Sequence, residues 1–201
     1  MTPPSVRLSA PARRKQLLDV AIDVFSDRGY HSASMNDLAS AAGVTKPVLY
    51  QHFESKHALY LALIDEVGNR LLTAIISSTV GFESGREKTI NGFIGYFNWV
   101  SEHPHEFKLL FGSTDRTDAD FLAAVRELES NVANAIAPLI NAAIDPAHQH
   151  TLALGLVGLA MGVSQHLVAE DIKIDAVAIG TQVAQLAWAG LRSVGKNPYQ
   201  D

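Results

Sequence analysis

Few side chains in this sequence have the types and spacing that a reaction centre requires. The candidates are two His-x-His pairs and one loop with three aspartates, namely His103 and His105, His148 and His150, and Asp115, Asp118 and Asp120. Both histidine pairs fall where a proline interrupts the helical pattern, so solvated loop histidines explain them better than a metal site. The sequence has no cysteine, and it lacks the GxSxG, P-loop, GxGxxG and HExxH patterns. We predict no enzyme activity, no cofactor and no metal.

Charge is unequally divided along the 201 residues. Residues 1–60 hold seven Lys or Arg and five Asp or Glu, a net charge of +2, whereas residues 61–201 hold nine and sixteen, a net charge of −7. The first eighteen residues carry four basic side chains and no acidic one. A basic first part on an acidic remainder predicts an anionic partner for the first part alone.

The apolar content of 47% is high enough for a sizeable core. The N-terminus has no apolar core of a signal peptide. The longest uninterrupted apolar stretch, 152–163, has twelve residues, and a bilayer needs about 20. We therefore expect a cytoplasmic protein without a membrane partner, and the lack of cysteine fits a reducing compartment.

The hydrophobic periodicity is helical almost throughout, and it predicts an all-α chain without strands or internal repeats. One long segment, Asp118 to Ile144, contains Pro138, which should kink or divide it. The first expected helix ends near Gly29, and others occupy 34–42, 45–52, 84–103, 104–111, 118–144, 148–170 and 175–194. A further helix begins after Ser55, with an apolar stripe on one face: Leu59, Leu63, Val67, Leu71 and Ala74.

Two of these helices are short and are separated by a turn with one glycine, which is the helix-turn-helix pattern. Ser34 and Asp37 have the spacing of a capping box. Gly43 can adopt a positive φ in the turn, and Thr45 can cap the second helix. Small and apolar residues are spaced so that the two helices cross closely over a shared core: Leu38, Ala39, Ala42, Val44, Leu49 and Phe53.

If Leu49 faces inward, Pro47 and Gln51 lie about 160° away on the outer face of the second helix. Gln51 could pair with adenine, and Pro47 or Val48 could touch a thymine methyl group. Four other side chains suit phosphates, which position a protein on DNA without specifying sequence: Lys46, Tyr50, His52 and Lys56.

The segment from Ala42 to Lys56, with Phe25, Gly29 and Tyr30 upstream, resembles the TetR family of bacterial regulators over residues 10–75. The resemblance implies an all-α homodimer of about nine helices, and a repressor that leaves a palindromic operator when a small, mostly apolar effector binds. The expected domains are a helix-turn-helix DNA-binding domain (1–55), a ligand-binding and dimerisation domain (56–195) and a loose tail (196–201). The positions that match the family's DNA contacts are Ser34, Asn36, Thr45, Lys46, Val48, Tyr50, Gln51, His52 and Lys56, to which we add Pro47.

A second stretch, Arg13-Arg14-Lys15, could add phosphate contacts or simply be a solvated helix start. In the later part of the chain, small residues line one side of two helices. Each glycine costs about 1 kcal/mol in a helix interior, so we predict that another helix backbone approaches there. The predicted dimer interface is a two-fold four-helix bundle that includes Gly155, Gly158, Gly162, Gly180, Ala184 and Ala187. The alternative is close packing inside one subunit.

Aromatic residues in the middle of the chain could surround an effector cavity between helices. The candidates are Phe93, Phe97, Phe107, Phe111, Asn131, Asn134, Met161, Gln165 and His166. The alternative is a regulator without an effector, whose second domain only dimerises. A large internal cavity would favour the first hypothesis and a solid core the second.

Overall fold

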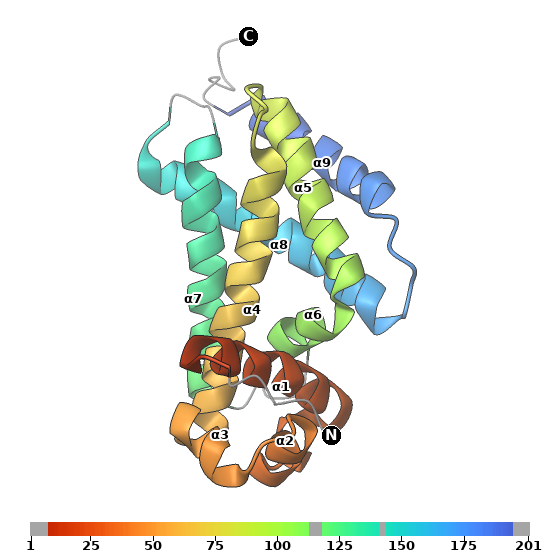
Figure 1. Ribbon diagram of the computed structural model, residues 1–201. Helices are drawn as coiled ribbons and strands as arrows, with labels where there is room; N and C mark the ends of the chain where they lie inside the picture. Colours follow the sequence, from red (N-terminus) through yellow and green to blue (C-terminus); the bar gives the residue numbers. More distant parts are fainter. Residues whose placement is uncertain (1–7, 113–117, 141–143, 195–201) are drawn as a thin grey trace.

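Three helices at one end of the molecule carry the predicted helix-turn-helix (Figure 1). They are α1 (Ala10–Ser32), α2 (Met35–Ala41) and α3 (Lys46–His52). We call residues 8–55 the head and the rest the body. The structure is a computed structural model that describes residues 8–112, 118–140 and 144–194. The predicted tail and Asp115 lie outside these ranges.

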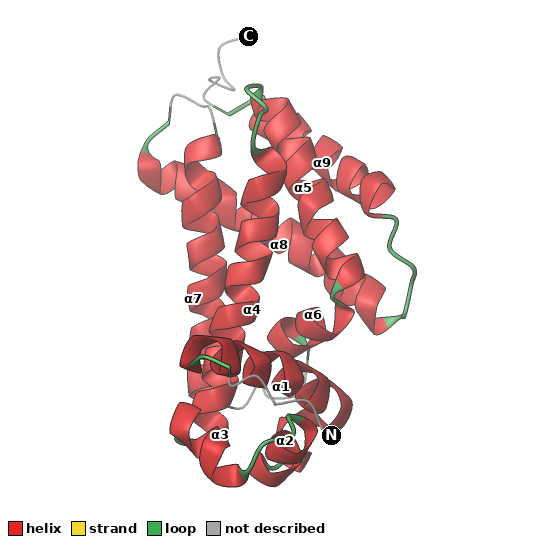
Figure 2. Cartoon of the chain, in the orientation of Figure 1, coloured by secondary structure: helices red, strands yellow, loops and turns green. Residues whose placement is uncertain are grey.

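The described body consists of six further α-helices and one 3-10 turn, and the described residues contain no strand (Figure 2). Serine or aspartate caps the start of five of these helices by accepting a backbone N–H. As predicted, Pro138 divides the long segment, because α7 ends at Ile136 and a 3-10 turn follows. The elements are α4 (Lys56–Thr79), α5 (Gly85–Glu102), α6 (Pro104–Phe111), α7 (Ala119–Ile136), η1 (Ala137–Leu139), α8 (Pro146–Ala169) and α9 (Ala176–Leu191).

Helix α4 runs from the head along the length of the body, with α7 beside it (Figure 1). Its buried face runs from Leu59 through Leu63, Val67 and Leu71 to Ile75. An ion pair from Arg70 to Asp19 also ties α4 to α1. One rigid element therefore connects the head to the interior of the body.

Helix α9 packs along α5, and this packing corrects part of the predicted dimer interface. A Cβ atom on Gly180 would lie 2.8 Å from the Cα of Ile94 in α5. Ala184 and Ala187 are buried on the same side of α9. These three small residues allow a close approach within one chain, so their placement at the dimer interface was wrong.

The glycines of α8, unlike Gly180, do not pack against another helix of the same chain. Gly155, Gly158 and Gly162 are exposed, and a Cβ on any of them would meet nothing within 4 Å. Close packing inside one subunit, the alternative explanation, therefore does not account for them.

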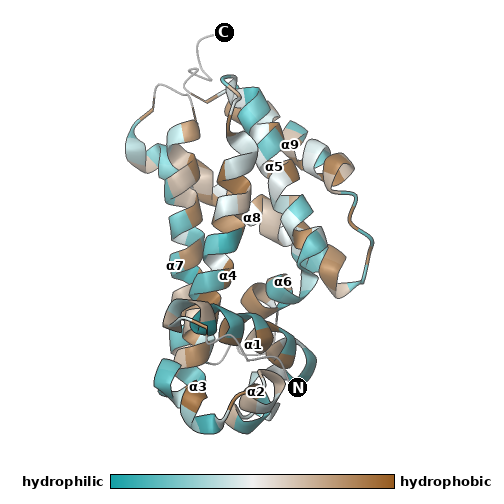
Figure 3. Cartoon of the chain, in the orientation of Figure 1, coloured by the Kyte–Doolittle hydropathy of each residue, from teal (hydrophilic) through white to brown (hydrophobic). Residues whose placement is uncertain are grey.

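Helix α8 is long and apolar enough to cross a membrane by length and composition, although the uninterrupted apolar stretch seemed too short. Only 17% of its most apolar window is buried within the chain. The middle of α8 carries apolar colours in Figure 3. This helix therefore exposes apolar surface that another structure would have to cover.

Candidate nucleic-acid interface and ligand cavity

The turn between α2 and α3 has the backbone that the sequence predicts. Gly43 has a φ of 63°, a conformation that side-chain-bearing residues rarely adopt. The N–H of Val44 donates to the carbonyl of Ala39 at 3.0 Å. Leu38 and Leu49 are buried beneath the turn, so the shared core of the two helices is confirmed.

The outer face of α3 presents the side chains that helical geometry placed there. Lys46, Pro47, Tyr50 and Gln51 are exposed, and Val48 is half-buried. The Lys46 ammonium lies 5.8 Å from the centre of the Tyr50 ring. This face combines an amide, a phenol, an ammonium and apolar groups without burying any of them.

Residues around α3 complete the predicted interface. Thr45 is exposed and adopts an extended backbone, but its side chain makes no capping hydrogen bond, contrary to the prediction. Its hydroxyl is therefore not used in capping α3. His52 is half-buried at the end of the helix.

The start of α2 is fixed by the predicted capping box. Ser34 accepts from the N–H of Asp37 at 3.2 Å and its own N–H donates to the Asp37 carboxylate at 2.9 Å. Arg28 pairs with the same carboxylate at 2.7 Å. The Ser34 side chain and backbone and the Arg28 guanidinium together hold the pKa of Asp37 below its ordinary value, although desolvation acts in the opposite direction. Asn36 is exposed beside them.

Lys56 has a different role from the predicted phosphate contact. Its ammonium donates to the carbonyls of Tyr30 at 2.7 Å, Ala33 at 2.9 Å and His31 at 3.3 Å. It also lies 4.4 Å from the centre of the Tyr30 ring. Because these carbonyls engage its donors, Lys56 joins the start of α4 to the end of α1.

The basic stretch of α1 is likewise engaged within the chain. Arg14 donates to the carbonyl of His52 at 3.0 Å and covers the Phe53 ring, so it holds α1 against the end of α3. Lys15 pairs with Asp19 in the next turn of the same helix.

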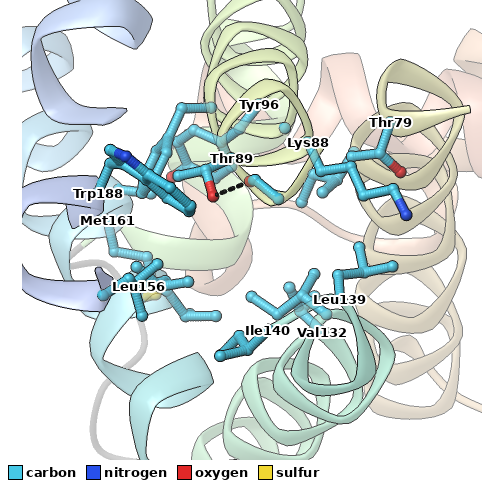
Figure 4. Close-up of a pocket in the computed structure, with 18 of the residues that line it drawn as sticks. Thr79, Lys88, Thr89, Tyr96, Val132, Leu139, Ile140, Leu156, Met161 and Trp188 are labelled. Atoms are coloured by element: carbon cyan, nitrogen blue, oxygen red, sulfur yellow. Dashed lines mark hydrogen bonds between the residues drawn. The ribbon is translucent and has the colours of Figure 1, made fainter. Parts of the chain in front are cut away.

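The body contains a cavity of about 390 Å³, partly open to solvent, between α4, α5, α7, α8 and α9 (Figure 4). Thr79 and Lys88 lie on one side of it, with Trp188 and Met161 opposite (Figure 4). Apolar side chains form most of the remaining wall: Leu71, Ile75, Phe93, Leu128, Val132, Ile136, Ile140, Leu156 and Val157.

Polar groups are few in this wall. Burial raises the pKa of the Tyr96 phenol, so it stays protonated. Burial also raises the pKa of Glu129, against the opposing charge of Arg126. The cations among the lining residues are Lys88 and Arg192. An apolar interior with two cations suits an amphipathic molecule with an anionic end.

The predicted ligand residues divide into three groups. Phe93, Phe111 and Met161 line the cavity, while Phe107 and Gln165 line a separate groove between head and body. The others do not line either, because Phe97 is fully buried core and three polar residues point outward: Asn131, Asn134 and His166.

Sequence reasoning missed the contribution of α4 and α9 to the cavity. Leu71 and Ile75 lie on the buried face of α4, and nothing in their spacing distinguishes a cavity wall from solid packing. Lys88 and Thr89 indicate a cavity better than Leu71 and Ile75 do, because they are polar residues on the face of α5 that turns toward the apolar body.

The comparisons with known proteins agree with this architecture. Residues 17–63 match the family model described as "Bacterial regulatory proteins, tetR family". The HTH-type transcriptional activator FasR of Mycolicibacterium smegmatis is 31% identical over 190 residues, which cover 94% of this chain and 87% of FasR.

Solved structures share the fold. A TetR-like regulator from Rhodococcus sp. RHA1 is 30% identical with a TM-score of 0.73, and the match covers 92% of this chain and 99% of that chain. FadR of Bacillus subtilis, solved in complex with stearoyl-CoA, is 17% identical with a TM-score of 0.75, covering 88% and 98%. These relatives are named as regulators and not as enzymes. The chain belongs to the TetR family of bacterial transcriptional regulators.

Proposed function

We propose that this regulator binds a palindromic operator as a cytoplasmic homodimer and leaves it when an amphipathic effector with a long apolar part occupies the body. The observation that carries the ligand-dependent part is the mostly apolar cavity of about 390 Å³, which is partly open to solvent. A body that served only for dimerisation would have no need for such a volume in its core.

The outer face of α3 is the part that would enter the major groove. Gln51 and Val48 can reach base edges, and Lys46 and Tyr50 can reach phosphates. Ser34 and Asn36, at the start of α2, would face the phosphate backbone of the DNA beside that groove. We no longer include Lys56 among these contacts, because its ammonium is engaged by the end of α1.

The outward faces of α8 and α9 are the proposed dimer interface. The three exposed glycines of α8 leave room for a second helix, and Leu154 beside them is 41% exposed. Two apolar side chains of α9, Val177 and Leu186, are 60% and 65% exposed. A second copy would bury these groups around a two-fold axis and hold two heads about 34 Å apart, one turn of DNA.

The effector would act through α4. Its last turns, at Leu71, Ile75 and Thr79, line the cavity. Its first residue, Lys56, is fixed to the head by hydrogen bonds to the end of α1. A ligand that moves the cavity end of this helix would therefore change the separation of the two heads. Release requires that the ligand bind the released state more tightly than the DNA-bound state.

The effector class is supported by the chemistry of the wall. An apolar chain fits between Val132, Leu156 and Trp188, and Lys88 and Arg192 can bind an anionic end. The B. subtilis protein was solved with stearoyl-CoA, so this fold can accommodate a long acyl chain. Long-chain fatty acids and their coenzyme A thioesters are therefore the first candidates.

Fluorescence anisotropy with DNA from upstream of the regulator's own gene tests this function. The wild type should bind the DNA with an affinity that falls steeply with salt, since phosphate contacts release counterions. Oleic acid or oleoyl-CoA should release it. Failure of both probes to change DNA affinity would contradict the effector class, whereas failure to bind DNA at low salt would contradict the DNA site.

A filled cavity supplies the sharper test. Ala160 lines the cavity and is 5% exposed, so Ala160→Phe should occupy the ligand's space and abolish release while DNA binding persists. Ala123 is exposed on α7, and Ala123→Phe is the matched control that should respond as the wild type does. Equal responses of the two variants would place the effector elsewhere.

The sign of regulation depends on where the operator lies relative to the promoter. Repression remains our prediction, although FasR is named an activator. A promoter–reporter fusion distinguishes them, because deletion of the gene should raise reporter output under repression and lower it under activation.

A further inference from the structure

Outside both proposed sites, three potential metal ligands from two elements meet at the junction of head and body. His57 lies in the first turn of α4, and Asp118 and Asp120 lie at the start of α7. Among the described residues, the group of three or more such side chains that could hold one cation is His57, Asp118 and Asp120.

The distances fit a small coordination sphere. Nε2 of His57 lies 3.5 Å from an oxygen of Asp118 and 3.5 Å from an oxygen of Asp120. The three donor atoms all lie within 4.8 Å of one another. Ligands about 2.1 Å from a tetrahedral ion are separated by about 3.4 Å, so only a small adjustment would place all three around one ion.

Two of the three side chains are held in position. One carboxylate oxygen of Asp118 caps α7 by accepting from the N–H groups of Asp120 at 2.9 Å and Phe121 at 3.2 Å. Its other oxygen is the one that faces His57. The imidazole of His57 stacks on the buried ring of Phe121, with the ring centres 4.8 Å apart and the planes 23° apart.

We propose that His57, Asp118 and Asp120 bind a divalent first-row transition cation of the Zn²⁺, Co²⁺ and Mn²⁺ class, with water completing its coordination. An imidazole nitrogen with two carboxylates suits these ions better than Mg²⁺ or Ca²⁺, which prefer oxygen ligands alone. The two aspartates stand out in the sequence, but His57 lies 61 residues before Asp118 and only the fold brings it beside them.

A cation at this site would join two helices of the body. His57 lies in the first turn of α4, which follows α3 in the chain, and α7 supplies Leu128, Glu129 and Val132 to the cavity wall. A bound cation would clamp the starts of α4 and α7 together. It should therefore stabilise the folded chain, because a ligand that binds only the native state raises its melting temperature.

Titration of the untagged full chain with Co²⁺ tests the proposal by the visible absorption of the protein-bound ion. The wild type should bind one equivalent with a sub-millimolar dissociation constant and should melt at a higher temperature with the ion. Zn²⁺ should displace Co²⁺, Mn²⁺ should do so only when in excess because it binds such ligands more weakly, and Mg²⁺ should not. Asp120 is 72% exposed, so Asp120→Asn should fold normally yet bind Co²⁺ at least about 10-fold more weakly. His57→Asn should lose binding as well.

His148→Asn is the matched control, because His148 is an exposed histidine of a His-x-His pair at the start of α8. It should bind Co²⁺ as the wild type does. Three results would overturn the proposal: no stoichiometric binding below 1 mM, unchanged binding by Asp120→Asn, or loss of binding in His148→Asn. The first would leave the three side chains as an ion pair alone.

Discussion

Small and apolar residues pack within the chain in the head, whereas several in the body are left exposed. In the head, a small residue and a turn glycine bring α2 and α3 together, and Met35, Leu38 and Leu49 of the pair are buried within the chain. In the body, α8 carries three glycines that touch nothing, and large apolar side chains of α8 and α9 are exposed. The head is complete by itself, whereas the body has a surface that a single chain leaves uncovered.

The contrast is sharpest between two glycines of the body. Gly180 lies against the backbone of α5, but Gly158 has open space in front of it. A glycine in a helix thus indicates close approach without saying whether the approaching backbone belongs to the same chain. The following substitutions separate these cases.

The largest effect is expected from Gly158→Leu. The new side chain would occupy the space proposed for the partner's helix, so dimers should dissociate while each chain stays folded. Because one head offers half of the contacts, operator affinity should fall by at least about 100-fold. Analytical ultracentrifugation and anisotropy measure the two effects. A stable dimer with unchanged operator affinity would place the interface on another face.

Gly180→Leu should act on stability instead. A Cβ at this position would lie 2.8 Å from backbone atoms of Ile94, which cannot yield as a flexible side chain can. Separation of α9 from α5 should cost about 3 kcal/mol or more, which corresponds to a fall in melting temperature of roughly 6–12 °C. An unchanged melting curve would contradict the tight packing of these helices.

The two regions also differ in how much their sequences reveal. The head is specified by local signals, because the capping box at Ser34, the turn at Gly43 and the buried Leu49 each act within a few residues. Where local reasoning failed in the head, a distant partner was responsible. Lys56 follows α3 in sequence, but its ammonium donates to carbonyls more than 20 residues earlier in the chain.

In the body, helix number, order and the break at Pro138 were predictable from periodicity. The face that each helix turns inward was not. Gly180 and Gly158 have the same local sequence signature, and only the placement of α5 distinguishes them. The polar residues Asn131 and Asn134 were assigned to the cavity by composition, although the helical phase of α7 places them in solvent.

Within the head, Gln51→Ala tests the base-reading face. Loss of a bidentate contact with adenine should cost about 1–3 kcal/mol on the operator and little on random DNA. Tyr50→Phe should instead weaken binding to both DNAs alike, since a phosphate contact carries no sequence information. Anisotropy on both DNAs measures the difference. Equal losses for Gln51→Ala would show that another residue reads the bases.

Lys56→Met and Lys46→Met form a matched pair across the boundary of head and body. Loss of the Lys56 ammonium removes its hydrogen bonds to the end of α1 and should lower the free energy of unfolding by about 1–2 kcal/mol. The salt dependence of DNA binding should not change. Lys46→Met should have the reverse effect, reducing the salt slope by about 1 without altering stability. Urea unfolding and salt titrations would contradict our assignment if the two variants behaved alike.

The smallest effect is expected where Asp19 of α1 meets Arg70 of α4. Burial acts in the opposite direction, but hydrogen bonds from Arg70 and Lys15 hold the pKa of Asp19 below its ordinary value. Its stabilising contribution is therefore fully present above the unfolded-state pKa of about 3.9 and is lost as pH falls through the lower, folded-state pKa. Since the pair is partly exposed, Asp19→Asn should cost only about 0.5–1 kcal/mol at pH 6. Urea unfolding at several pH values should show this difference from the wild type shrinking as pH falls below about 3.9 and through the lower, folded-state pKa. A difference that stayed constant with pH would mean that Asp19 joins head and body by its shape and not by its charge.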